Sequence, residues 1–344
     1  MANRYWVGGT GTWNAASTAN WSATSGGASG ASAPTSADIV FIDASSGSGT
    51  ITLGANIDIV RLDARNSTIN VDWNSYKISI NGSSSTVWYS GGITATGATE
   101  AKVEFTYSGS VARTINTRSG VSENGAISVY VTAGSGNFQI SSGSTGILQN
   151  LNFTGFSGAF LVTSTGSSLT IYGNLIFSST MTLPSQTGAI IMRGVLTTKQ
   201  ITTAAKTIDF PLTFNGAGGV YAFQDALTQG SSRAFTITDG TVQLKSGVTS
   251  TVGSFVASNA NTKYLQSTTP GSQATISQAS GTINVSDLTI QDSNAAGGAS
   301  WNAYADYENT DAGNNDGWNF SLSPPYATYE PPIIIRSFTQ PRRF

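Results

Sequence analysis

Ala-Asp-Ile-Val-Phe-Ile-Asp-Ala at residues 37–44 returns twenty residues later as Ile-Asp-Ile-Val-Arg-Leu-Asp-Ala at residues 57–64. The positions that fall in step are Asp38 with Asp58, Ile39 with Ile59, Val40 with Val60, and Asp43 with Asp63. A short strand-like phrase repeated at about this period is typical of a β-solenoid, in which each coil stacks on its neighbour. The sequence therefore predicts an all-β rod, with residues 39–41 and 59–61 in adjacent coils of one parallel sheet.

Further short runs of alternating apolar residues fill the chain from about 37 to 292, each bounded by Gly, Ser, Asn or Thr. This alternation indicates strands. Asn-Leu-Asn-Phe at 150–153 recurs as Asn-Leu-Ile-Phe at 174–177, so the spacing here is 24 residues. Unequal spacings suggest coils of variable length. A pair of β-sandwiches is the alternative, but it would need longer strands and would show no repeats in step.

The composition suits stacked strands and argues against several classes of function. Charged residues make up 10% of the chain, well below the usual share of about 25%. The polar surface must therefore consist of hydroxyls and amides, which can hydrogen-bond from coil to coil. The net charge of −2 provides no basic field for nucleic acid. Because the chain has no Cys and no His, it lacks the commonest nucleophile, general base and metal ligands.

We therefore expect no catalytic residues, no cofactor and no metal. No apolar run approaches the roughly 20 residues that a membrane span requires, so membrane insertion is not expected. The start Met-Ala-Asn-Arg-Tyr-Trp has neither an apolar core nor a cleavage site, so we expect no secretory signal.

Tryptophans mark both ends of the predicted rod. Trp6, Trp13 and Trp21 lie in a Gly-rich stretch at residues 1–36, which we interpret as an N-terminal cap over the first coil. The alternative is that these rings are platforms for sugars. The body of the β-helix follows at residues 37–292, and Trp301 and Trp318 bracket a closing region at residues 293–320.

The closing region contains one loop that resembles a cation site. Its polar residues are Asp311, Asn314, Asn315 and Asp316. Asx residues beside Gly313 and Gly317 are also what tight turns require, and the acidic spacing differs from that of an EF-hand. We predict a turn, with a structural cation as the alternative.

The last segment, residues 321–344, holds five of the nine prolines and an isoleucine run. Paired prolines favour an extended path that cannot join the coils, and an exposed β-branched run suits a strand that adds to a partner. We predict an extended docking arm, with packing along the body of the same chain as the alternative. The predicted docking residues are Tyr329, Pro331, Pro332, Ile333, Ile334, Ile335, Arg336, Phe338, Arg342, Arg343 and Phe344.

Only one set of acids falls in step along the sequence. If Asp38 stacks on Asp58, and Asp43 on Asp63, each pair lies one coil apart, at about 4.8 Å. Such a pair of carboxylates could supply an acid catalyst through like-charge repulsion. Arg61 and Arg65 are close enough in sequence to neutralise it. We therefore predict a salt-bridged ladder, and no enzyme activity.

Two motifs resemble the termini of virion-associated β-helix proteins of tailed bacteriophages. The first is Tyr-Trp-Val-Gly-Gly-Thr-Gly-Thr-Trp at 5–13, with Asn-Trp-Ser at 20–22 and the stretch 34–41. The second is Asn-Asn-Asp-Gly-Trp-Asn-Phe at 314–320. A looser likeness connects the first motif to autotransporter passenger repeats. The resemblance implies a structural virion protein, namely a fibre, spike or capsid decoration protein, and it implies no catalytic residue.

By analogy with phage fibres, we expect a homotrimer attached through residues 321–344 to other virion proteins of the capsid or tail. The protein would be made in the host cytoplasm and located in the virion. The alternatives are a receptor-binding fibre or adhesin that recognises a host surface glycan, and a glycan-cleaving tailspike.

Overall fold

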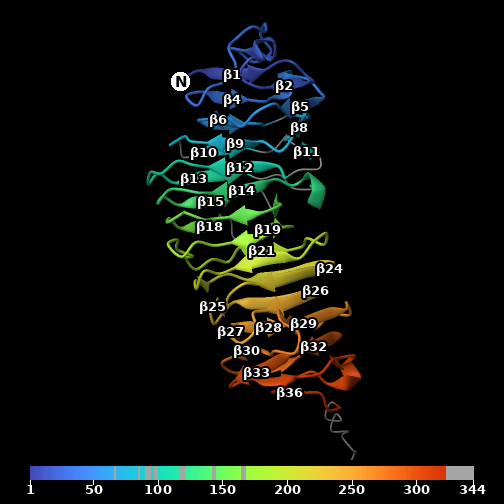
Figure 1. Ribbon diagram of the computed structural model, residues 1–344. Helices are drawn as coiled ribbons and strands as arrows, with labels where there is room; N and C mark the ends of the chain where they lie inside the picture. Colours follow the sequence, from blue (N-terminus) through green and yellow to red (C-terminus); the bar gives the residue numbers. More distant parts are fainter. Residues whose placement is uncertain are drawn as a thin grey trace, which may run out of the picture.

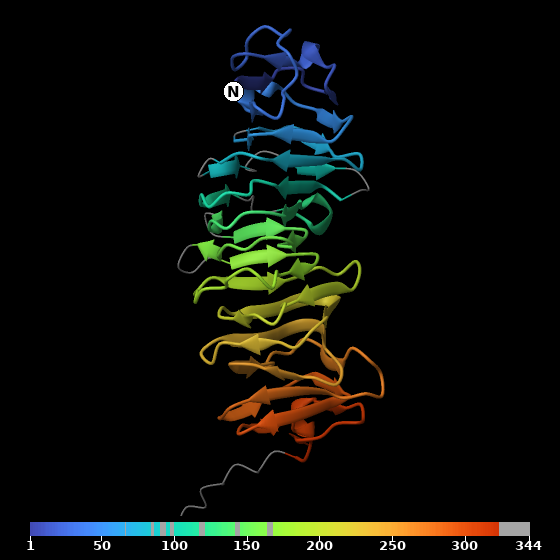
Figure 2. The ribbon, with the colours of Figure 1, turned by 60° about the vertical axis from the view of Figure 1, so that its left-hand side comes forward.

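The protein is a rod of stacked β coils. The computed structural model describes residues 1–65, 67–83, 86–89, 94–96, 100–116, 121–141, 145–163 and 168–322. They form a β-solenoid of about 11 turns, whose strands cross the rod axis and whose coils follow one another in sequence order (Figures 1 and 2). The predicted all-β solenoid is confirmed, and the two-sandwich alternative is wrong. Among the described residues, no helix is long and apolar enough to span a bilayer.

In the N-terminal half, each coil contributes strands to three sheets in turn. The first sheet contains β1 (Asn3–Trp6), β3 (Trp21–Ser22), β4 (Ile39–Phe41), β7 (Arg61–Asp63), β10 (Thr86–Tyr89), β13 (Arg113–Asn116), β15 (Phe138–Ser141) and β18 (Phe160–Thr163). The second contains β2 (Gly11–Trp13), β5 (Thr50–Leu53), β8 (Asn70–Asp72) and β11 (Thr94–Thr96).

The third sheet runs along nearly the whole rod. Its strands are β6 (Ile57–Ile59), β9 (Lys77–Ile80), β12 (Lys102–Phe105), β14 (Ser128–Val131), β16 (Thr145–Leu148), β17 (Leu151–Asn152), β19 (Ser168–Ile171), β20 (Leu175–Ile176), β21 (Ala189–Met192), β22 (Lys199–Thr202), β24 (Leu212–Phe223), β26 (Ala234–Leu244), β28 (Ser254–Val256), β29 (Lys263–Ser267), β32 (Leu288–Gln291) and β35 (Thr310–Asp311).

Two smaller sheets and four short 3₁₀ turns complete the described structure. The fourth sheet contains β23 (Thr207–Ile208), β25 (Thr228–Gln229), β27 (Thr249–Thr251), β30 (Ala274–Gln278) and β33 (Ser293–Gly297). The fifth contains β31 (Thr282–Asn284), β34 (Ser300–Asn302) and β36 (Trp318–Asn319). The 3₁₀ turns are η1 (Thr18–Asn20), η2 (Ala44–Ser46), η3 (Glu123–Gly125) and η4 (Ala305–Tyr307).

The register of the first repeat differs from the prediction. β4 pairs in parallel with β7, so that Val40 faces Leu62 and not Val60. Ile59 belongs to β6, which pairs with β9 in the third sheet. The coil is therefore two residues longer than the sequence repeat. The similar phrases at 37–44 and 57–64 straddle the corner between β6 and β7, so they do not stack in step.

The second repeat is confirmed. β17 pairs in parallel with β20, and Leu151 faces Leu175 as the spacing of 24 predicts. Variable coil length is also confirmed, because Val40 and Leu62 face each other across 22 residues whereas Ile115 and Ile140 do so across 25. Insertions at the corners change the length of a coil without disturbing the strands that it stacks.

Inward-pointing residues fill the centre of the rod. Ile78, Val103 and Val129 occupy matching positions in successive coils of the third sheet, and all three are fully buried. Phenylalanines add a column through the middle coils, with ring centroids 4.8–6.3 Å apart. Contacts of this kind bury 150–250 Å² for each ring. The packing of one coil on the next therefore stabilises the rod.

The tryptophans close both ends of this core. Trp21 packs edge-on against Trp6 and Trp13, with centroids 5.1 Å away in each case, and all three side chains are at most 1% exposed. The predicted aromatic cluster at the N-terminal end is thus confirmed, whereas the alternative of sugar platforms is wrong because no ring face is open. At the other end Trp301 packs against Trp318 at 5.0 Å.

Strand pairing extends past the predicted limits of the body, 37 and 292. β1 already pairs with β4 in parallel, and β34 pairs with β36 in parallel at the far end. Of the described strand pairs, only β1 with β3 is antiparallel, with Trp6 facing Trp21. Both Trp-rich segments therefore belong to the stacked coils.

Candidate functional site

The predicted docking residues, from Tyr329 to Phe344, lie outside the described residues. The described rod can be searched for other sites. Four kinds of polar arrangement occur on it: the aspartates of the N-terminal coils, the loop at 311–316, cations that point into the core, and a charged group on the third sheet.

The predicted ladder of aspartates does not form. Asp38 accepts hydrogen bonds from the backbone N–H groups of Ala2 and Thr35, at 2.8 and 3.1 Å. Asp43 caps η2, where its carboxylate accepts from the N–H of Ser45. Asp58 is exposed on β6 and faces Ser79. Because the true register is 22 residues, the four carboxylates serve separate local purposes and cannot act as pairs.

The two arginines near this segment also have separate contacts. Arg65 forms an ion pair with Asp63 at 2.7 Å, as expected. Arg61 instead packs over the ring of Phe41, with its guanidinium carbon 5.9 Å from the ring centroid. Asp63 therefore has the only arginine ion pair among the four aspartates of the proposed ladder, within the described residues.

Asp38 fixes the start of the chain to the second coil. Burial opposes its ionisation, but the hydrogen bonds from Ala2 and from the N–H and hydroxyl of Thr35, with the charge of Arg4, lower its pKa overall. A carboxylate whose pKa is lower in the folded state stabilises the fold at pH values above its unfolded pKa and loses this effect as the pH falls through the folded value. Asp38 is a structural residue.

The loop at 311–316 is tied together by its own hydrogen bonds. Asn315 donates to Asp311 at 2.6 Å, and Asn314 donates to Asp292 at 2.6 Å. Gln273 donates to Asp316 at 2.8 Å. No group of three or more acidic side chains that could hold a metal ion occurs in the described ranges. These contacts fit the predicted turn.

Three cationic side chains point into the rod, which the sequence analysis did not anticipate. Arg113, Lys199 and Lys263 are at most 2% exposed, and each begins a strand at a corner of the coil. A buried charge is costly unless it is paired or well hydrogen-bonded. Burial lowers the pKa of Arg113 and that of Lys263.

Arg113 is the least satisfied of the three. Its Nη2 donates to the carbonyl of Ala133 at 3.0 Å, whereas Nε and Nη1 have no partner among the described residues. Its guanidinium lies against Phe138 and Phe156, 5.9 Å from each centroid. Packing on aromatic faces offsets part of the cost of burying the charge.

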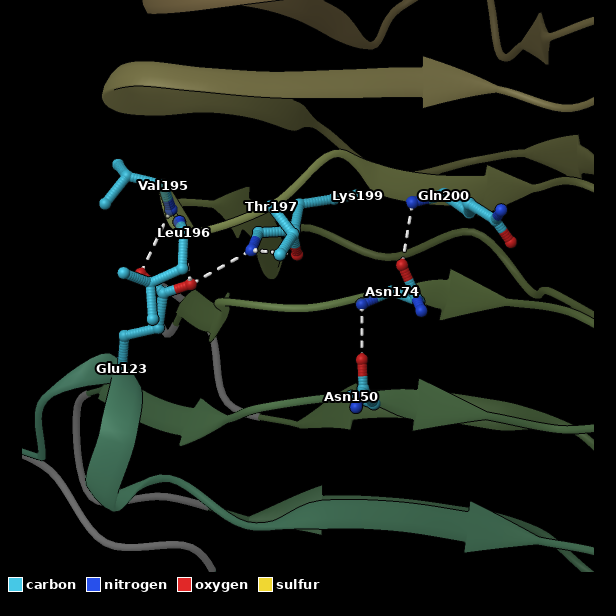
Figure 3. Close-up of polar contacts among 8 residues, drawn as sticks. All are labelled: Glu123, Asn150, Asn174, Val195, Leu196, Thr197, Lys199 and Gln200. Carbon is cyan, nitrogen blue, oxygen red and sulfur yellow. Dashed lines mark hydrogen bonds and ion pairs between the residues drawn. The ribbon is translucent and has the colours of Figure 1, made fainter. Parts of the chain in front are cut away.

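Lys199 forms a buried ion pair with Glu123 (Figure 3). The Nζ–Oε1 distance is 3.0 Å, and the side chains are 2% and 11% exposed. Glu123 also accepts hydrogen bonds from the backbone N–H groups of Val195 and Leu196, at 3.0 and 3.4 Å. One carboxylate from η3 thus fixes the turn that precedes β22, and it links segments 76 residues apart.

The turn fixed by Glu123 presents two apolar side chains to solvent. Val195 is 44% exposed and Leu196 is 62% exposed. Just beyond the turn, Asn150, Asn174 and Gln200 align in successive coils (Figure 3). The amide oxygens of Asn150 and Asn174 each accept from the backbone N–H of the next coil, at 2.6 and 2.7 Å. The amide ladder stabilises the stack in the way that the composition predicted.

A charged group lies on the outer face of the third sheet. Lys77 pairs with Glu104, and Lys102 lies over the ring of Tyr130, 3.9 Å from its centroid. Glu100 accepts hydrogen bonds from the hydroxyl of Tyr130, at 2.9 Å, and from Asn150, at 2.7 Å. Burial, with the charge of Glu100, raises the pKa of Tyr130. Each charge is engaged by a neighbour.

A glycosidase needs one carboxyl group as a proton donor and a second as a nucleophile or base. Glu100 and Glu104 are the two carboxylates closest to this arrangement, because both act on the Tyr130 hydroxyl. Their contacts with Lys77, Tyr130 and Asn150 give them structural roles. The described face is thus better suited to rigidity than to acid–base chemistry.

Comparison with known proteins adds no relative to this picture. No protein family, no curated protein and no solved structure matches the chain.

Proposed function

We propose that the chain is a non-enzymatic structural component of a bacteriophage particle, namely a fibre, a spike or a capsid decoration protein. The observation that carries the proposal is the uninterrupted solenoid with a core closed by aromatic rings at each end. About 11 coils at about 4.8 Å per coil give a rod roughly 50 Å long. A stiff rod of this kind suits a protein that displays or spaces other components.

Attachment is assigned to residues 321–344 and to partners in the capsid or tail. The composition of this segment, rather than its geometry, supports the assignment: prolines favour an extended arm, isoleucines and phenylalanines supply apolar area, and arginines favour an acidic partner. We also propose a homotrimer, in which the rods lie side by side and cover part of one another's outward faces.

The virion assignment predicts that the protein is a constant part of purified particles. An antibody raised against the rod should label intact particles after density-gradient separation, at a fixed number of copies per particle. The control is a lysate that contains the free protein mixed with particles that lack its gene. A protein found only in the soluble fraction would contradict the assignment.

A glycan-cleaving tailspike is the enzyme alternative, and it makes the opposite prediction. We expect the purified protein to release no new reducing ends from host capsule or lipopolysaccharide, because the described carboxylates are engaged in structural contacts. The variants Glu100→Gln and Glu104→Gln serve as matched controls. Depolymerisation by the native protein that either variant abolishes would replace the structural role with an enzymatic one.

A further inference from the structure

A bulge of glycines interrupts the third sheet two-thirds of the way along the rod. Asn215 in β24 faces Asp239 in β26, and the next facing pair is Val220 with Thr241. Residues 216–219 therefore lie against Gly240 alone and protrude. Gly218 and Gly240 have φ values of +76° and +82°, a conformation that other residues rarely adopt. The sequence Asn-Gly-Ala-Gly-Gly at 215–219 permits this shape.

The next coil contributes a loop that is fixed from inside the rod. The Nζ of Lys263 donates to the carbonyl of Asn259 at 2.5 Å, to its Oδ1 at 2.8 Å and to the carbonyl of Asn261 at 2.6 Å. The side-chain amides of Asn259 and Asn261 both donate to the carbonyl of Thr238. A buried ammonium group and two amides thus hold the loop 259–262 in one shape against β26.

A hollow of about 590 Å³ lies between this loop and the glycine bulge. Its volume falls within the range of small-molecule sites, about 300–1,000 Å³. Asp239, Thr241, Asn261, Thr262 and Tyr264 contribute polar or aromatic side chains to the lining. The Oδ1 of Asp239 accepts from the N–H of Gly240 at 2.8 Å, which orients the carboxylate. Its other oxygen has no protein partner within the described structure.

We propose that this hollow binds a neutral saccharide. Neighbouring hydroxyls of a sugar donate well to a carboxylate, and a hydrogen bond to a charged acceptor is about twice as strong as a neutral one. Asn261, Thr241 and Thr262 offer further amide and hydroxyl groups, and the ring of Tyr264 can pack against the C–H face of a pyranose. Because the loop is held by Lys263, little ordering entropy is lost on binding.

Charge determines which saccharides fit. None of the described residues that line the hollow is cationic, and Asp239 supplies a negative charge. An acidic sugar would bring a second negative charge with no partner, whereas a neutral hexose or N-acetylhexosamine would not. The site therefore selects against uronic and sialic acids.

This inference goes beyond the proposed structural role and does not depend on attachment through residues 321–344. A rod that lacks a saccharide site can still be part of a particle, and a rod that binds a saccharide can be absent from one. The two proposals therefore fail in different experiments.

The test uses the full chain and a panel of immobilised neutral oligosaccharides built from glucose, galactose, mannose and N-acetylglucosamine. Polygalacturonate and polysialic acid are the acidic probes. We expect binding to at least one neutral probe and to neither acidic one. Asp239→Asn should weaken this binding by about ten-fold or more, because it removes the charged acceptor but can keep the contact with Gly240. Tyr264→Ala should weaken it to a similar extent.

Two matched variants control for general effects. Asp58→Asn removes an exposed carboxylate on β6, and Tyr307→Ala removes a ring in η4 that is 37% exposed. Neither should change binding, and all four variants should unfold at the temperature of the native protein within a few degrees. Absence of binding to every neutral probe would overturn the proposal, as would binding that both Asp239→Asn and Tyr264→Ala leave unchanged. Stabilisation by calcium alone, lost in Asp239→Asn and with no saccharide bound, would instead identify a cation site.

Discussion

Deletion of residues 324–344 is expected to leave a folded rod that no longer enters the particle. The described coils end at β36 and its flanking residues, so the deletion removes none of the strand pairs or aromatic contacts that form the core. The isoleucines at 333–335 can bury apolar surface worth about 25 cal/mol per Å², or several kcal/mol in total. The prolines limit the entropy that the segment loses when it docks.

The measurement is the copy number of native and truncated protein in particles assembled in the same host. Far-UV circular dichroism and thermal unfolding of the truncated chain establish that the rod still folds. A point variant sharpens the result: Ile333→Asp with Ile335→Asp should reduce incorporation, whereas Thr339→Ala in the same segment should not. Incorporation of the truncated chain at normal copy number would place the anchor on the rod itself.

Removal of the cation of the buried ion pair should destabilise the rod strongly. Lys199→Met leaves the carboxylate of Glu123 without its cation at a position where the side chain is 11% exposed. Breaking a buried pair from one side costs about 3–5 kcal/mol. The double variant Glu123→Gln with Lys199→Met removes both charges, so its loss of stability should be smaller than that of Lys199→Met alone. Urea unfolding followed by circular dichroism measures both.

The chain offers a matched control on its surface. Lys77→Met breaks the pair with Glu104, but the Lys77 side chain is 36% exposed, so water can solvate the remaining charge. Its cost should stay within about 1 kcal/mol, the usual value of an exposed pair. If Lys199→Met proves no more harmful than Lys77→Met, the link between η3 and β22 contributes little to stability.

The fold could be predicted from the sequence because the alternation of apolar residues and the positions of tryptophans depend directly on burial. The register was harder to predict. The repeat of 20 residues compared β4 with a segment that spans a corner, and only the spacing of 24 compared a strand with its true neighbour. Corner insertions shift a sequence repeat without leaving a signal in the alternation itself.

The buried cations show which signal was missed. Lys199 lies two residues before Ile201 in one strand, and Lys263 lies two residues before Leu265, so each lysine shares the inward face with an apolar residue. Strand parity alone therefore placed these charges in the core. Their partners could not be predicted in the same way, because Glu123 meets Lys199 across three intervening coils through a 3₁₀ turn that no repeat indicates.

The single antiparallel strand limits how the rod can associate end to end. An open parallel edge is a template on which further chains can polymerise into a cross-β filament. Along the first sheet, β3 reverses the direction of the chain over β1 and places Trp21 over Trp6 inside the core. A second rod that approached here would meet a short strand of the wrong polarity for continued stacking. The same turn of chain that completes the core thus acts as a terminator of growth, which protects a fold built by repetition from repeating indefinitely.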